Sequence, residues 1–327
     1  MKIKELTANV LFRIHPLSQH LIRRTYEKNL AIVLNYHRLC DYEDPFSPAL
    51  PVSVFREQMH WLAENFTPVT VEELAERRHR GLSIGGLAAV TFDDGYLDNY
   101  QFAFPIMRAL GIPATFYVTT GFLDGSLPWF ERIHLSLRHT SKKQARLRLN
   151  GQEYDLSLKN SKERLRAVAF VKDKLKRIPM THLPYYLTEM EERLAVDVER
   201  YGSNRIMNWE HVRELAAAGM EIGSHTVNHP ILSRIGEKEM RFEIAESKAQ
   251  LESKLRQPVT SFCYPNGKRG DFSARAKKIV QEAAYKSAVT TEVGYLTAET
   301  DCFEIPRFYT SIQNTATFSL KILLGRN

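Results

Sequence analysis

Two histidines and two aspartates stand out in this sequence, because their types and spacing suit metal-dependent hydrolysis. His225 and His229 lie four residues apart, and Asp93 and Asp94 are adjacent. A spacing of four residues brings two imidazoles to one side of a helical turn, where both could bind one cation. Two imidazoles and one carboxylate form a common catalytic zinc set that leaves a coordination position open for water.

Each of these signals also has a simpler explanation. A histidine pair at this spacing is more often a surface pair or a hydrogen-bonded pair than a metal site. Asp93-Asp94-Gly95 is also ordinary turn sequence, in which aspartates accept hydrogen bonds from backbone amides. Two carboxylates beside an apolar strand, however, repel each other unless a cation compensates their charge. If Asp94 bound that cation, Asp93 would be left ionised beside it and could act as a general base.

The pattern of apolar segments explains how distant residues could meet. It predicts buried parallel strands, separated by helices, over residues 31–36, 87–92, 114–118, 220–224, 260–264 and 286–289. This alternation is typical of a parallel α/β sheet or barrel. His37, Asp93-Asp94, His225 and Asn266-Gly267 all follow strand ends. In such folds, active sites form at the C-terminal edge of the sheet.

The alternation breaks between about residues 122 and 205, where charged, helix-prone sequence replaces a short connection. We interpret this segment as a helical insertion. Trp129 and Phe130 open it and could stack on a sugar ring, although buried aromatics are the commoner case. The predicted organisation is a basic amphipathic leader (1–29), a first part of the barrel (30–121), the helical insertion (122–205) and a second part of the barrel (206–327).

The leader contains six basic and two acidic residues within its first 30 positions, interleaved with apolar residues at roughly helical spacing. Such a segment could lie on an anionic membrane. It could equally be a helix that packs its apolar face on the domain. Both interpretations remain open at this stage.

Composition limits the other function classes. The chain has 327 residues, 43% hydrophobic and 25% charged, which is typical of a globular protein. It has no apolar run of about 18 residues that would span a bilayer, and no secretory signal is recognisable. We therefore expect a cytoplasmic protein, with peripheral contact at the inner membrane face as the alternative. The net charge of +7 comes with no nucleic-acid-binding module, so no nucleic-acid partner is expected. The three cysteines form no Cys-x-x-Cys pair.

Three motifs resemble those of a known family. Thr91-Phe92-Asp93-Asp94-Gly95 and His225-Thr226-Val227-Asn228-His229 resemble the first two motifs of the NodB-homology polysaccharide deacetylases, carbohydrate esterase family four. Phe262-Cys263-Tyr264-Pro265-Asn266-Gly267 is similar to the third. The resemblance covers roughly residues 30–120 and 205–310. It implies a distorted (β/α) barrel, a divalent cation with zinc as the expected metal, and removal of N-acetyl groups from N-acetylhexosamine units.

The resemblance also implies a role for each matching residue. Asp93 would be the catalytic base, and the metal ligands would be Asp94, His225 and His229. The third motif would form one wall of the substrate groove through Tyr264, Pro265 and Asn266, with the Asn266 amide donating to the oxyanion.

The sequence departs from the family pattern in two places. Many members carry an arginine in the third motif that holds the catalytic aspartate, whereas this chain has Cys263, and we expect Arg307 to take that role. The Leu-x-His motif that supplies the general acid is absent, and no histidine follows His229. Members with an amino-terminal Tyr-His, such as the poly-N-acetylglucosamine deacetylases, use that histidine instead, so we expect His37 to be the acid. The simpler explanation of His37 is a buried, hydrogen-bonded histidine.

These observations favour a hydrolase that removes N-acetyl groups from a polysaccharide or a lipid-linked glycan precursor, as in exopolysaccharide biosynthesis. An O-acetyl esterase is the nearest alternative, because the same groups would cleave an ester whose leaving group needs less protonation. A non-catalytic carbohydrate-binding protein is the other alternative, although such a protein would have no need of Asp93.

Overall fold

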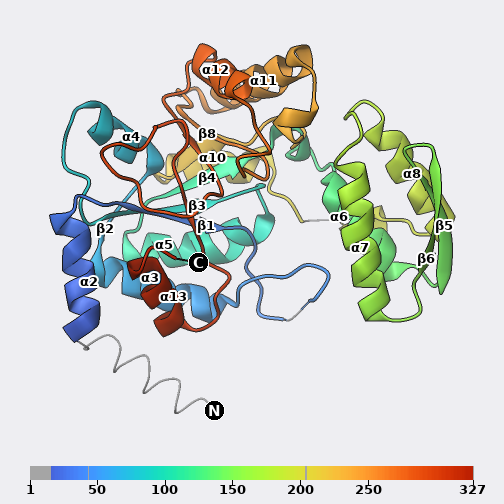
Figure 1. Ribbon diagram of the computed structural model, residues 1–327, viewed down its shortest axis with the longest axis horizontal. Helices are drawn as coiled ribbons and strands as arrows, with labels where there is room; N and C mark the ends of the chain where they lie inside the picture. The colour runs from blue at the N-terminus through green and yellow to red at the C-terminus, as the bar shows by residue number, and fades with distance from the viewer. Residues whose placement is uncertain (1–15, 43, 203–204, 327) are drawn as a thin grey trace.

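The chain forms a curled parallel sheet covered by helices, with a separate lobe beside it (Figure 1). The computed structural model describes residues 16–42, 44–202 and 205–326. Within them, the main sheet has the order β10-β1-β3-β4-β7-β8-β9, and β2 also pairs with β3. Its strands are β1 (Ile32–Tyr36), β2 (Thr67–Val69), β3 (Leu87–Phe92), β4 (Ala114–Val118), β7 (Glu221–Ser224), β8 (Ser261–Cys263), β9 (Ser287–Val289) and β10 (Phe308–Tyr309).

All pairings in this sheet are parallel, so the C-terminal ends of its strands meet at one edge. The two ends of this order, β9 and β10, come together in a curled sheet, because Val289 of β9 forms a parallel bridge with Ile305, which precedes β10. The predicted distorted (β/α) barrel is thereby confirmed. The six predicted strands are present to within one residue at each end, whereas the short strands β2 and β10 were not predicted.

Helices cover the outside of the sheet. They are α2 (Pro16–Glu27), α3 (Val52–Asn65), α4 (Val71–His79), η1 (Asn99–Ala103), α5 (Phe104–Leu110), η2 (Thr120–Phe122), α10 (Trp209–Ala217), η3 (Leu232–Arg234), α11 (Glu237–Leu255), α12 (Ala274–Glu282) and α13 (Thr315–Leu323).

Alternation along the strands divides the core into two sets of side chains. In β3, Ala88, Val90 and Phe92 belong to the larger cluster, where Phe92 stacks on Phe116 with ring centroids 4.9 Å apart. Leu87 and Ala89 face the other way, into a smaller cluster with residues of β1, β4, β8 and β9. Since successive side chains point to opposite faces, Thr91 and Asp93 continue this second face. The strand pattern thus carries Asp93 toward the inside of the curled sheet.

The insertion is the lobe drawn in green in Figure 1. It contains α6 (Trp129–His139), β5 (Gln144–Leu149), β6 (Gln152–Ser157), α7 (Ser161–Leu175), α8 (Leu183–Leu194) and α9 (Glu199–Gly202). The interpretation of the segment as helical was therefore wrong for residues 144–157, which form an antiparallel hairpin. Its turn is Asn150-Gly151, both with positive φ (50° and 78°), and Asn-Gly is the characteristic two-residue hairpin turn.

The insertion has its own apolar core, which Phe46 and Tyr96 of the barrel join. A buried polar contact links the same two parts. Glu131 of α6 accepts hydrogen bonds from the Tyr96 hydroxyl (2.8 Å) and from Arg205 Nη1 (3.0 Å). The apolar contact and the Tyr96–Glu131 hydrogen bond therefore hold the lobe against the barrel, and the ion pair joins α6 to the last residue of the insertion.

The two interpretations of the leader can be compared only in part, since residues 1–15 lie outside the described residues. In α2, Leu21 and Ile22 are buried in the main core, and the helix contacts α13. The packing interpretation therefore holds for this helix, and membrane binding by residues 1–15 stays a prediction. Among the described helices, none is long and apolar enough to span a bilayer.

The Glu131 contact yields a stability prediction. Glu131→Gln should lower the free energy of unfolding by about 3 kcal/mol, because it leaves the largely buried Arg205 guanidinium without its carboxylate. Asp155→Asn is the matched control, since it makes the same charge change at an exposed pair in the same lobe and should have little effect. Urea unfolding of both variants measures the difference. Equal stabilities would contradict the linking role of Glu131.

Candidate active site

The loop after β3 presents the two aspartates at the C-terminal edge of the sheet. The Asp93 N–H donates to the Tyr36 carbonyl (3.1 Å), which extends the pairing of β1 and β3 by one residue. Asp94 and Gly95 then have positive φ values of 73° and 81°. This left-handed turn ends the strand and directs the two carboxylates differently, so that they reach different partners.

The loop after β7 presents the two histidines. Thr226 and His229 have positive φ values of 68° and 57°, so residues 225–229 form an irregular loop. The expectation that a helical turn brings the two imidazoles together was therefore wrong, and left-handed bends do so instead. The Nε2 atoms of His225 and His229 lie 3.5 Å and 3.3 Å from Asp94 Oδ1.

Asp94, His225 and His229 fit a metal ion. Their ligand atoms lie within 4.8 Å of one another, and all three residues are buried. Asp94 Oδ1 has no hydrogen-bond partner among the described residues, and an unsatisfied buried carboxylate oxygen is costly unless a cation compensates it. Burial lowers the pKa of His229 to about 3, which keeps its imidazole in the neutral form that binds metals.

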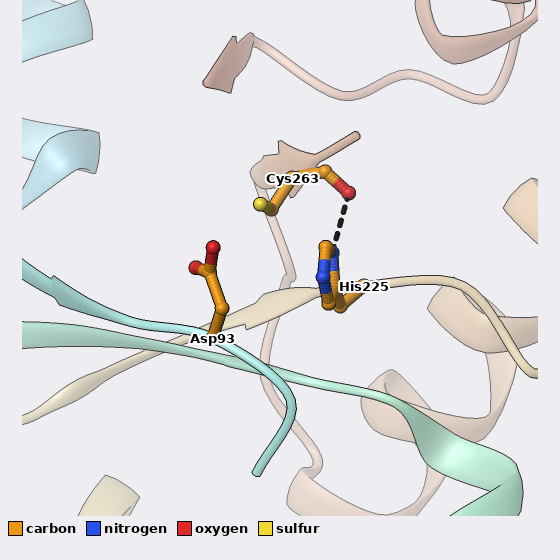
Figure 2. Close-up of side chains that lie close together, drawn as sticks. All are labelled: Asp93, His225 and Cys263. Atoms are coloured by element: carbon orange, nitrogen blue, oxygen red, sulfur yellow. Dashed lines mark hydrogen bonds between the residues drawn. The ribbon is translucent and has the colours of Figure 1, made fainter. Parts of the chain in front are cut away.

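A backbone contact fixes the orientation of His225. Its Nδ1 donates to the Cys263 carbonyl at 2.7 Å (Figure 2), which leaves Nε2 as the ring nitrogen on the side of Asp94. Hydrogen bonds of this kind commonly fix the tautomer and ring orientation of metal-binding histidines.

A second group of potential ligands, Asp93, His225 and Cys263, also lies within 4.8 Å (Figure 2). The Arg307 guanidinium already contacts two of these side chains, since its Nη2 lies 2.8 Å from Asp93 Oδ2 and 3.3 Å from Cys263 Sγ. A second cation beside this guanidinium would be repelled. The charges therefore favour the Asp94 group as the metal site.

Arg307 binds both oxygens of Asp93. The Nη1–Oδ1 and Nη2–Oδ2 distances are both 2.8 Å, and Arg307 is almost fully buried. Nη1 and Nε also donate to Thr91 Oγ1 (2.9 Å) and to the Thr290 carbonyl (2.8 Å). Burial raises the pKa of Asp93, but the charge and hydrogen bonds of Arg307 outweigh it and hold this pKa below its usual value. Asp93 is thus ionised at neutral pH, as a base must be.

Arg307 therefore holds Asp93, as the sequence predicts. Cys263, the last residue of β8, has a small side chain that lies against the Arg307 guanidinium. A larger side chain at this position would compete with the guanidinium for the same volume. The arginine therefore reaches Asp93 from the start of β10.

His37 lies on the open side of the site. Its side chain is 44% exposed, and Nε2 is 3.9 Å from Asp93 Oδ2. This exposure differs from the buried, hydrogen-bonded histidine that was the simpler explanation. Its backbone is held in place, since the His37 carbonyl accepts from Asn99 Nδ2 at 2.6 Å. The imidazole therefore faces the pocket from a fixed strand end.

Two of the three predicted groove residues line the pocket. A pocket of about 200 Å³ is lined by Tyr264 and Asn266, together with His37, the aspartates and the metal-binding histidines. Pro265 does not line it. Tyr264 is buried and stacks on Phe272 with centroids 4.0 Å apart, and its N–H donates to the Val289 carbonyl. It therefore contributes to the wall, and the oxyanion role of the Asn266 amide stays a prediction.

The insertion supplies the opposite wall, through Trp129 and Phe130 of α6 and through Lys172 and Lys176 at α7. Trp129 Nε1 donates to the His229 carbonyl at 3.4 Å, and the Phe130 ring lies edge-on to the His229 imidazole at 5.3 Å. Both aromatic residues are buried, so they act mainly as packing around a predicted ligand. The two lysines were not predicted, because a charged helix carries no sign of where it packs.

Glu243 is another residue that the sequence analysis missed. From α11, its carboxylate accepts from the N–H groups of Val227 (2.9 Å) and Asn228 (2.8 Å) and from Asn228 Nδ2 (2.7 Å). It thus holds the loop between the two histidines. A signal was present, because Glu243 falls on the buried stripe of α11 with Met240 and Ile244, where a carboxylate needs a partner.

Arg307→Met should lower the free energy of unfolding by about 3–5 kcal/mol, because it leaves Asp93 buried and unpaired. The double variant Asp93→Asn with Arg307→Met should recover a large part of this loss, since it also removes the uncompensated charge. Urea unfolding of both proteins measures the effect. A single variant as stable as the wild type would show that the ion pair does not support the fold.

Glu243→Ala should weaken zinc binding by about 10–100-fold, because the loop between His225 and His229 loses its buried acceptor. Isothermal titration of the metal-free protein with zinc measures this change. Glu246→Ala is the matched control, since this carboxylate lies on the same helix and contacts Gln250 instead of the loop. Unchanged affinity in the Glu243 variant would mean that the loop holds its conformation without it.

Comparison with known proteins places this geometry in a family. The sequence matches the polysaccharide deacetylase family over residues 84–198 and 198–288. YxkH of Bacillus subtilis (strain 168) is 22% identical over 277 residues, which cover 84% of this chain and 69% of YxkH. The poly-beta-1,6-N-acetyl-D-glucosamine N-deacetylase of Escherichia coli (strain K12) is 31% identical over 107 residues, which cover 32% of this chain but only 16% of that protein.

Solved structures share the fold. The Streptococcus pyogenes deacetylase PplD in complex with acetate superposes with a TM-score of 0.61 at 18% identity, over 90% of this chain and 98% of PplD. IcaB from Ammonifex degensii gives a TM-score of 0.55 at 19% identity, over 89% of this chain and 97% of IcaB. At these identities the likeness concerns the fold alone. Because the family match extends over more than half of the sequence and includes both the aspartate and the histidine motif, the chain belongs to the polysaccharide deacetylase family.

Proposed function

We propose that this polysaccharide deacetylase uses a zinc ion held by Asp94, His225 and His229 to remove N-acetyl groups from an amino-sugar glycan. The observation that supports the proposal is the convergence of these buried ligand atoms beside an ionised Asp93. A pure binding site would have no need of a second carboxylate fixed in this way. The match to the Escherichia coli enzyme motivates N-acetylglucosamine as the sugar.

The residues of the chain divide the work of amide hydrolysis between them. A zinc ion would polarise the acetyl carbonyl and acidify the attacking water. Asp93 accepts a proton from that water, and Arg307 keeps the carboxylate oriented and ionised until this proton arrives. The departing amine requires a proton, and His37 is the exposed group that can donate it from the open side of the pocket. Attack and departure are thus served by separate residues.

The dimensions of the site limit what can enter it. The pocket of about 200 Å³ is smaller than the roughly 300–1,000 Å³ that encloses a whole small ligand. It therefore accommodates the acetamido group and part of one sugar ring, and the remainder of the glycan lies outside. Both a polysaccharide and a lipid-linked glycan precursor meet this requirement.

Acetate release from a panel of glycans tests the proposal. The zinc-loaded enzyme should release acetate from N-acetylglucosamine oligosaccharides, and chelation should abolish this release until zinc is restored. Asp93→Asn should lower kcat by about 10²–10⁴-fold, because the base is lost. His37→Ala should lower kcat for N-acetylated substrates more than for O-acetylated ones, since an alcohol leaves with less need of a proton.

The control is the unfolding midpoint of each variant, which shows whether a loss of activity reflects a loss of fold. Activity that persisted after both chelation and Asp93→Asn would overturn the mechanism. Release of acetate only from O-acetylated glycans would instead identify an esterase.

A further inference from the structure

Two lysines of the insertion face the pocket. Lys172 lies in the last turn of α7, Lys176 directly follows this helix, and both line the cavity that holds the metal-binding residues. They lie four residues apart, so they occupy one side of the helix. Each is partly buried, and burial lowers the pKa of both ammonium groups. The insertion thus adds to the site two basic groups that the barrel alone would not supply.

Neither lysine has a carboxylate within ion-pair distance in the part of the chain that the structure describes. Lys172 Nζ lies 3.5 Å from His134 Nε2, and Lys176 Nζ donates to Asn266 Oδ1 at 3.4 Å. Both partners are uncharged, since burial lowers the pKa of His134 to about 3. Several arginines of the insertion, in contrast, have a carboxylate partner, as Arg132 has Glu191 at 2.7 Å.

The carboxylates that line the pocket do not balance the two lysines. Asp93 is neutralised by Arg307, which leaves Asp94 as the other acidic side chain of the lining. A divalent cation on Asp94 would more than compensate that charge. The metal-loaded pocket would therefore be strongly positive, and holding such charges together is unfavourable unless an anion joins them.

The positions of the lysines indicate where the anion would lie. Lys172 Nζ is 5.9 Å from the centre of the Phe130 ring, which contacts His229, and Lys176 contacts Asn266 after β8. The lysines thus lie on the wall of the pocket that the insertion supplies, near His229 and Asn266, where a second group of the bound sugar would meet them.

We propose that Lys172 and Lys176 bind an anionic group, a phosphate or a carboxylate, on the substrate beside the N-acetylated sugar. The preferred glycan is therefore acidic, such as a phosphorylated glycan or one with a neighbouring uronic acid. This inference rests on the proposed function and adds the charge of the substrate to it. Two ammonium groups suit a phosphate or carboxylate as point charges, and desolvation in the pocket strengthens the interaction.

The experiment compares kcat/KM for acetate release from three matched N-acetylglucosamine oligosaccharides: one neutral, one with a phosphate monoester and one with a neighbouring uronic acid. The wild type should prefer at least one acidic substrate by about tenfold or more, because a hydrogen bond to a charged group contributes on that scale. Lys172→Gln and Lys176→Gln should each reduce this ratio, mainly through KM. The acidic substrate with the higher kcat/KM identifies the anion as a phosphate or a carboxylate.

Lys174→Gln is the matched control. This lysine lies on the same helix, but its ammonium lies over the rings of Tyr154 and Phe170 instead of the pocket. It should leave the ratio unchanged. The two pocket variants should also keep the wild-type unfolding midpoint, since neither lysine has an ion pair to lose.

Binding to the Asp93→Asn protein separates this inference from the proposed function. If no substrate releases acetate but the acidic glycan still binds this protein about tenfold more tightly than the neutral one, the lysine inference stands while the proposed function fails. Equal affinity and equal kcat/KM for acidic and neutral glycans would overturn the inference. So would pocket variants that lose activity on all three substrates to the same extent.

Discussion

The buried ion pair between Arg307 and Asp93 connects the two ends of the sheet as well as the two halves of the site. Arg307 directly precedes β10, at one end of the strand order, and its Nε donates to the Thr290 carbonyl after β9, at the other end. β9 and β10 do not form a ladder with each other among the described residues, so this side chain adds to the backbone bridge between Val289 and Ile305 that joins the two ends of the sheet. The same guanidinium fixes the carboxylate that faces the pocket. One side chain therefore both supports closure of the sheet and orients the base.

Other buried carboxylates hold the loops that carry the remaining groups. Asp98 accepts from Arg38 Nε at 2.9 Å and from the Leu39 N–H at 3.3 Å, beside the backbone of His37. Glu243 accepts from two N–H groups of the histidine loop. Loops with left-handed residues leave backbone donors without regular partners, and a buried donor must be satisfied. The strand ends after β1 and β7 thus each have a nearby acid as an acceptor, which limits how far these parts of the site can rearrange.

The insertion changes the character of a site whose reactive groups all come from the barrel. Its first helix, α6, packs two aromatic residues around His229, and its second helix, α7, brings two lysines to the same pocket. Glu131 and Arg205 secure this lobe at both of its ends. Chemistry and recognition are therefore assigned to different parts of the chain: the strand ends provide the ligands and the base, and the inserted lobe provides the charge and the shape that a glycan would meet.

The sequence by itself determined the parallel strands and the residues at their ends, because a strand buried on both faces is a continuous apolar run and its end is marked by polar residues. His37, the aspartate pair and His225 were found in this way. Tertiary structure decided which residues from distant parts of the chain meet. Arg307 meets Asp93 across 214 positions, Glu243 reaches back to the histidine loop from another element, and α7 turns Lys172 inward but Lys174 away. Such contacts depend on how elements pack, and local periodicity carries no information about which distant charge an element will meet. The hairpin at Asn150-Gly151 was a different case, since its turn was present in the sequence and only the helix-prone surroundings obscured it.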